Sequence, residues 1–337
     1  MKSKYWIVAL GVLWLAAGLR AEVNPGGYLS FQFLKGQKQS AYDRGSFEDL
    51  LAGFLVSGNI DSNFTFALEA RLDGQGAAAL DQAWAGVHLS KLINARAGLF
   101  LVPFGRYNQI SLPLQAPLVR LPLNIEGTYP ARWRDIGVCA EGGLGIFSYA
   151  AFIGNGPAEG ETLSDGQQFR DNNRNKGMGI RGTVLLANSM EAGVSYYLGK
   201  PDSEDARDLR LLGLDMRWVT TGYEILAEYT RAELENPAPF SAGTAEGYYV
   251  LLAMNFGGIH PTFSYQRFTY DDLVHGAGFV SPEAPGAGIS RDLVRWTVGA
   301  RCLLSDKFLI KAEYDINKEK GITLNDNLLS LQLAFGF

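Results

Sequence analysis

A regular alternation of short and long connections between strand-like segments is the feature that most constrains the fold of this chain. About sixteen such segments are expected, near 27–35, 48–57, 62–73, 78–90, 93–102, 132–142, 146–154, 177–187, 189–199, 208–219, 222–234, 246–256, 259–271, 292–303, 307–317 and 327–337. The even-numbered gaps are tight, as at Lys91-Leu92 and Gly257-Gly258, whereas the odd-numbered gaps are mostly long and polar. An even-stranded antiparallel barrel with both termini at one end shows this alternation.

Within the segments, side chains alternate between an apolar face and a charged or small one. Phe308 and Ile310 share one face of a segment whose other face carries Lys311 and Glu313. The final segment, which ends at Phe337, repeats the pattern with leucine and phenylalanine. A soluble sandwich would bury the apolar face, but it gives no reason for the alternating gaps. We therefore predict an all-β fold, a transmembrane antiparallel β-barrel with an oily outside and a wet lumen.

The amino terminus predicts export. Lys2 and Lys4 precede an apolar run at 5–18, and Leu19, Arg20 and Ala21 follow before Glu22. This pattern is typical of a secretory signal peptide, here residues 1–21, with cleavage after Ala21. The barrel domain is then 22–337, in the bacterial outer membrane. No later run reaches the roughly eighteen apolar residues of a spanning helix.

Composition excludes several classes of protein. Charged residues make up 19% and the mean hydropathy is −0.02, which is too polar for a helical membrane protein. The net charge of −5 argues against a nucleic-acid partner. Cys139 and Cys302 fall on opposite faces of the predicted wall, so neither a disulfide nor a metal site is expected. No cofactor is predicted. Trp84, Trp133 and Trp296 lie near strand ends and are expected in the interfacial aromatic girdles.

Charged side chains on the lumen-facing parity are the candidate pore lining. They are Arg71, Arg96, Asp135, Glu141, Arg181, Arg217, Glu228, Arg295, Arg301, Lys311 and Glu313. Both signs are interspersed along the predicted inner wall. Such groups select ions by compensating part of their lost hydration. They equally well hydrate the wall and pair with one another, and the sequence leaves both interpretations open.

The connection 103–131 is long and unusually apolar, which disfavours exposure to external water. As the third external loop it is expected to fold into the barrel, rest its leucines on the inner wall and narrow the channel. The predicted constriction residues are Arg106, Arg120, Glu126 and Arg132. Contact between protomers is the alternative use of such a loop.

Three motifs carry a resemblance to a known family. They are Ala97-Gly98-Leu99-Phe100-Leu101-Val102-Pro103-Phe104-Gly105, Arg134-Asp135-Ile136-Gly137-Val138 and Tyr149-Ala150-Ala151-Phe152-Ile153-Gly154-Asn155-Gly156. In order and spacing they resemble the phosphate-selective porin O and P family. The resemblance implies a trimeric outer-membrane barrel with an inward-folded third loop. The aromatic last residue, Phe337, resembles the signal by which outer-membrane barrels engage their assembly machinery.

Phosphate selectivity itself is not expected, because the acidic chain lacks a lysine cluster. We predict passive diffusion of small hydrophilic solutes or ions, with weak selectivity and with anions such as phosphate among them. The alternative is a barrel-anchored adhesin that uses loops 155–176 and 272–291. Catalysis is not predicted, because His88, His260 and His275 stand beside no nucleophile motif.

Overall fold

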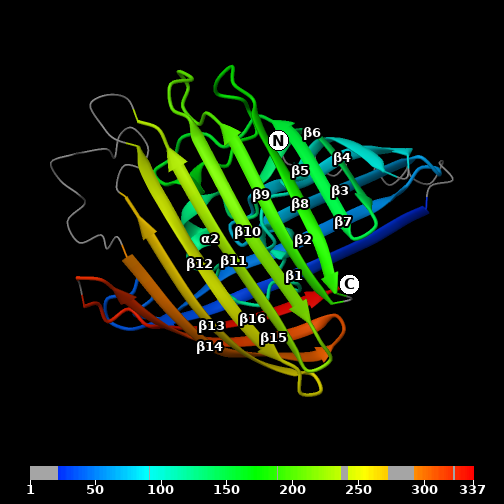
Figure 1. Cartoon of the computed structure of the whole chain (residues 1–337). Coiled ribbons are helices and arrows are strands. Elements are labelled where there is room, and N and C mark those ends of the chain that lie inside the picture. Colours follow the sequence, from blue (N-terminus) through cyan, green and yellow to red (C-terminus); the bar gives the residue numbers. More distant parts are fainter. Residues whose placement is uncertain (1–21, 91, 188, 237–241, 272–291, 322) are drawn as a thin grey trace.

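The computed structural model describes residues 22–90, 92–187, 189–236, 242–271, 292–321 and 323–337. The predicted signal peptide and His275 lie outside the described residues. Sixteen strands form one closed antiparallel barrel, and each pairs with its neighbours in sequence (Figure 1). The predicted fold class and strand number are confirmed.

Each predicted segment corresponds to one strand. The strands are β1 (Glu22–Gly36), β2 (Ser46–Asn59), β3 (Phe64–Asp73), β4 (Ala78–Ser90), β5 (Ile93–Leu101), β6 (Arg134–Leu144), β7 (Phe147–Gly154), β8 (Gly177–Ala187), β9 (Met190–Gly199), β10 (Leu209–Val219), β11 (Tyr223–Leu234), β12 (Gly243–Met254), β13 (Ile259–Tyr270), β14 (Asp292–Ser305), β15 (Phe308–Glu319) and β16 (Leu328–Gly336). The largest difference from expectation is at β1, which begins at Glu22 rather than near residue 27.

The first and last strands close the barrel. β1 pairs with β16 in a register that runs from Tyr28 opposite Gly336 to Gly36 opposite Leu328. Beyond that ladder, the N–H of Gly27 donates to the Phe337 carbonyl at 3.2 Å, and the Phe337 N–H donates to the Gly27 carbonyl at 3.1 Å. The strand edges at the seam are therefore paired, which removes the open edge of the sheet.

The outer face of the wall is apolar, as the alternation predicts. On β16, Leu331 and Phe335 are exposed while Gln332 is buried, and on β15 Ile310 is exposed while Lys311 is buried. A barrel that turns its leucines and phenylalanines outward presents the surface that lipid solvates. No helix within the described residues has the length and apolarity to span a membrane. Cys139 is buried on the inward parity, Cys302 lies on the outward parity, and both are free thiols.

Candidate channel and its loop

The connection between β5 and β6, residues 102–133, lies against inward-facing side chains of the wall. It contains a short 3-10 helix, η1 (Tyr107–Ile110), and one α-helical turn, α2 (Leu123–Thr128). Figure 1 shows α2 behind β11 and β12, on the concave side of these strands, and α2 contacts β11, β12 and β13. We call residues 102–133 the lumen loop.

Glu228 of β11 holds the start of the lumen loop. Its Oε2 accepts the N–H groups of Arg106 at 3.0 Å and Tyr107 at 2.8 Å. Its Oε1 accepts the hydroxyl of Tyr129 at 3.3 Å. A carboxylate that accepts several donors can be buried without leaving an unpaired charge. Gly105 has a φ of +63°, and an added Cβ would collide with the Glu228 carboxylate. The turn therefore requires glycine.

Two neighbouring side chains of β15 hold the middle of the lumen loop. The ammonium of Lys311 donates to the carbonyls of Pro113 at 2.9 Å and Leu118 at 3.3 Å. The carboxylate of Glu313 accepts the N–H of Val119 at 2.8 Å. The wall thus supplies both donors and acceptors to a loop backbone that has few partners of its own.

An aromatic cluster joins the lumen loop to the wall. Trp133 is 1% exposed, and its ring centroid lies 5.8 Å from that of Phe104, 6.3 Å from Phe152 of β7 and 5.0 Å from Tyr197 of β9. The expectation that Trp133 belongs to an interfacial girdle is wrong, because the inward-facing aromatics of the wall provide an apolar surface that a tryptophan can cover. Trp84 also departs from it, since it is partly buried against the cluster that contains Trp133, with the Arg96 guanidinium over its ring at 5.5 Å.

A buried charge cluster fixes the end of the lumen loop. Asp81 of β4 falls where the register shifts, since Glu69 pairs with Gln82 and Ala70 with Leu80. This bulge turns the Asp81 carboxylate towards Arg132, whose Nε lies 3.3 Å from it, and towards Arg134, which donates to it. Arg132 also donates to Glu69 at 2.5 Å.

Arg71 of β3 is the third guanidinium of this cluster. It lies 3.6 Å from the Asp81 carboxylate and is the most exposed of the three. Arg71, Arg132 and Arg134 therefore share two buried carboxylates. We call these arginines, with Glu69 and Asp81, the arginine cluster.

Several expected pore-lining residues are buried and do not face open water. Asp135, Arg181, Glu228, Arg295, Lys311 and Glu313 are each less than 9% exposed. Asp135 accepts the N–H groups of Asn155 at 3.0 Å and Gly156 at 2.8 Å, so it fixes the start of the next external loop. Arg181 forms a bidentate pair with Asp215, at 2.5 and 2.8 Å. Their inward parity is as predicted, but the lumen loop and neighbouring polar groups cover them.

The other expected lining residues keep more exposure. Arg96 lies 3.3 Å from Glu141, and Arg217 donates to Glu224 at 2.7 Å. Arg301 is partly exposed and stands opposite Lys311 in the β14–β15 register. Arg96, Arg217 and Arg301 lie on the strand halves that lead to the short turns.

Arg120 and Glu126 of the lumen loop form a charged neck with Arg295 of β14. Arg120 donates to Glu126 at 3.2 Å and lies 3.8 Å from Asp315, while Arg295 donates to the other Glu126 oxygen at 3.3 Å. Burial raises the pKa of the Glu126 carboxyl, but the guanidinium groups of Arg295 and Arg120 outweigh it, so the pKa lies below its usual value.

Two cavities meet at this neck. The inner cavity, of about 330 Å³, lies between the lumen loop and the wall formed by β1, β2, β3 and β16. The outer cavity, of about 340 Å³, is lined by the β1–β2 connection and by β14 and β15. Tyr42, Arg120 and Glu126 line both. Of the predicted constriction residues, Arg120, Glu126 and Arg132 therefore line the inner cavity, whereas Arg106 lies 2.9 Å from Glu191 on another side of the loop.

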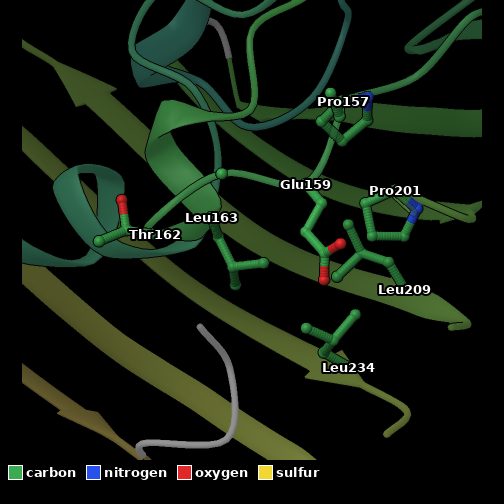
Figure 2. Close-up of a pocket in the computed structure, with 9 residues that line it drawn as sticks. Pro157, Glu159, Thr162, Leu163, Pro201, Leu209 and Leu234 are labelled. Carbon is green, nitrogen blue, oxygen red and sulfur yellow. The ribbon is translucent and has the colours of Figure 1, made fainter. Parts of the chain in front are cut away.

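Residues of the connection between β7 and β8 line a small pocket together with Pro201, Leu209 and Leu234 (Figure 2). Glu159 pairs with Arg207, and the Glu159 N–H donates to the Pro201 carbonyl at 2.8 Å. Leu163 lies near Leu209 and Leu234 in the same view. The space between these residues is about 10 Å³, at most enough for one water. This space is therefore too small for a solute.

The sequence did not single out Asp81, Tyr28 or the leucines of the inner cavity as site residues. A register shift exposes Asp81 to the arginines, and strand alternation alone does not reveal such a bulge. Within the described ranges, no group of three or more His, Cys, Asp or Glu side chains is arranged to hold a metal ion. His88 contacts Asn94 on the neighbouring strand.

Comparisons with known proteins support the architecture. No family model matches this chain. A curated relative, described as an uncharacterized protein of Aquifex aeolicus (strain VF5), is 23% identical over 192 residues, which cover 52% of this chain and 44% of the relative. The chain thus matches less than half of that relative's length.

Solved structures share the barrel across nearly the whole chain. The anion-selective porin from Comamonas acidovorans has a TM-score of 0.68 and 11% identity, with 94% of this chain and 100% of the porin covered. The trimer form of OmpT, an outer membrane protein of Vibrio cholerae, has a TM-score of 0.67 and 9% identity, with 94% and 99% covered. The chain therefore has the fold of sixteen-stranded porins. The narrower resemblance to the phosphate-selective porin O and P family rests on its sequence motifs alone.

Proposed function

We propose that this protein is an outer-membrane porin that lets small hydrophilic solutes and ions diffuse passively through its lumen. The observation that carries the proposal is the pair of cavities that meet at Tyr42, Arg120 and Glu126, inside a closed barrel with an apolar exterior. A lumen with charged side chains at its narrow part conducts hydrated ions and discriminates among them by charge.

The lumen loop is the proposed constriction. It is anchored to Glu228, Lys311 and Glu313 and leaves its other side towards the inner cavity. Arg120, Glu126 and Arg132 are the constriction residues that line this space. The more exposed inward-facing groups, among them Arg71, Arg96, Glu141, Arg217 and Arg301, are the proposed hydrated lining.

Selectivity is proposed to be weak. The inner cavity is lined by Arg71, Arg120 and Arg132 and by Asp49 and Glu126, so opposite charges face the same space. Anions such as phosphate are among the solutes that such a pore passes. A homotrimer is the proposed assembly, in keeping with the trimer form of the Vibrio cholerae protein that shares the fold.

Planar-bilayer recording of refolded residues 22–337 tests the proposal. We expect discrete conductance steps in potassium chloride, and a small reversal potential under a salt gradient. A folded barrel that never conducts would overturn the proposal and favour a barrel-anchored adhesin. Block by micromolar phosphate would contradict weak selectivity while leaving the porin assignment in place.

A further inference from the structure

The inner cavity is less polar than a channel for hydrophilic solutes requires. From the wall, Leu34 and Leu51 line it, and from the lumen loop Leu112, Ala116 and Leu121 do so. A porin lumen is ordinarily polar, because the solutes that cross it keep their hydration shells. Leucines on both sides of one narrow space favour a solute that has an apolar body.

The arginine cluster places a cation at the edge of the same space. Asp81 is completely buried, and Arg132 and Arg134 both contact its carboxylate. Arg71 reaches this carboxylate only at 3.6 Å, with 28% of its side chain exposed, and it lines the inner cavity. Its guanidinium is therefore the group of the cluster that can accept an additional anionic partner.

The two carboxylates that line the inner cavity do not cancel its preference for an anionic partner. Glu126 is held between Arg120 and Arg295. Asp49 is an exposed residue of β2 in a left-handed conformation, with a φ of +50°. Arg120 and Arg132 are likewise paired with carboxylates, so Arg71 is the least engaged guanidinium of the cavity lining.

We propose that the inner cavity binds small amphipathic anions, in particular aromatic carboxylates, with the ring between the leucines and the carboxylate at Arg71. The proposal rests on the porin function and names a preferred solute class for it. The volume of about 330 Å³ is at the lower end for small-molecule sites, which suits a single ring with one charged substituent.

Single-channel recording with matched solutes tests this inference. Benzoate, acetate and benzylammonium are added in turn to a channel that conducts potassium chloride. Benzoate is expected to interrupt the current in a concentration-dependent way, because it pauses at the leucines, while acetate and benzylammonium are not. Equal effects of benzoate and acetate, or block by benzylammonium alone, would overturn the inference without touching the porin function. A folded protein that passes no current would instead overturn the porin function.

Three variants assign the block to this cavity. Leu51→Gln and Leu112→Gln remove one apolar contact each, from the wall and from the loop, and each is expected to weaken the benzoate block by roughly tenfold. Arg71→Gln is expected to weaken it similarly. Arg231→Gln, on the outward face of β11, makes the same charge change away from the lumen and is expected to leave the block unchanged.

A gel-mobility shift on heating shows that each variant has folded as a barrel. Because the leucine variants lie on separate elements, misfolding of one leaves the other as a test. Folded leucine variants that bind benzoate as tightly as the parent would overturn the inference.

Discussion

Two sectors of the inner wall carry the same alternating sequence pattern but have different surroundings. Strands β9 to β15 hold the lumen loop, and their inward charges, such as Glu228 and Lys311, are buried against its backbone. Strands β1, β2, β3 and β16 face the inner cavity. The comparison shows that alternation determines which side chains point inward, whereas the path of one loop determines which of them meet water.

The largest expected effect follows from removing Asp81, which joins the end of the lumen loop to β3 through Arg132 and Arg71. Asp81→Ala leaves buried arginines without their shared carboxylate. Removing one partner from a buried ion pair costs about 3–5 kcal/mol, and we expect a loss of that size in the free energy of unfolding. Urea titration of the refolded barrel in lipid measures it.

Asp306→Ala is the matched control for Asp81→Ala. Asp306 is exposed in the turn between β14 and β15, and surface substitutions usually change stability by no more than about 0.5 kcal/mol. If both variants unfold at the urea concentration of the parent, the arginine cluster does not stabilise the contact between the lumen loop and β3.

Glu228→Ala would convert part of the packed sector into open lumen. The N–H groups of Arg106 and Tyr107 lose their acceptor, at a cost of about 1–3 kcal/mol for an unsatisfied buried group. We expect the lumen loop to loosen and the single-channel conductance to rise. The control is Glu224→Ala, which removes an inward carboxylate near the short-turn end. A parental conductance in Glu228→Ala would mean that Lys311 and Glu313 suffice to hold the loop.

The strands and their order were predictable because the apolar and polar side chains that alternate along each strand show which face meets lipid and which faces inward. The packing of the lumen loop was not. Tyr197 and Tyr249 follow Tyr196 and Tyr248 in the sequence. Only the residues that surround Tyr197 and Tyr249 inside the barrel identify them as part of the apolar surface on which the lumen loop packs. Asp81 depends on a register shift between two strands, which neither strand's sequence shows. Contacts between distant segments thus decided which predicted lining residues became anchors.

A smaller effect is expected at the neck, where the two sectors face each other. Arg120→Gln removes one positive charge beside the solute path. At a distance of about 8 Å in water, a unit charge changes the free energy of a monovalent ion by about 0.5 kcal/mol, roughly a twofold change in its local concentration. We expect the reversal potential under a salt gradient to shift in the direction of cation preference, by the amount that a roughly twofold change in local ion concentration produces. Arg231→Gln should leave it unchanged, and a shift of equal size there would place the selectivity outside the lumen.

The smallest expected effect is that of low pH on the neck. Its direction follows from the pKa of Glu126. Arg295 and Arg120 hold the pKa of this carboxyl below its usual value despite burial. The charged form therefore stabilises the folded neck fully above the unfolded-state pKa of about 4.3, and this contribution is lost as the pH falls through the lower folded-state value.

Comparing the parent with Glu126→Gln isolates this group from the other carboxylates of the lumen. The ratio of the two conductances should stay constant from pH 7 to pH 5, and it should approach one only below about pH 4. The variant already lacks the charge that the parent loses in acid. A ratio that changed between pH 7 and pH 5 would mean that the arginines do not hold the pKa of Glu126 below its usual value. The neck would then be as exposed to water as the wall formed by β1 to β3.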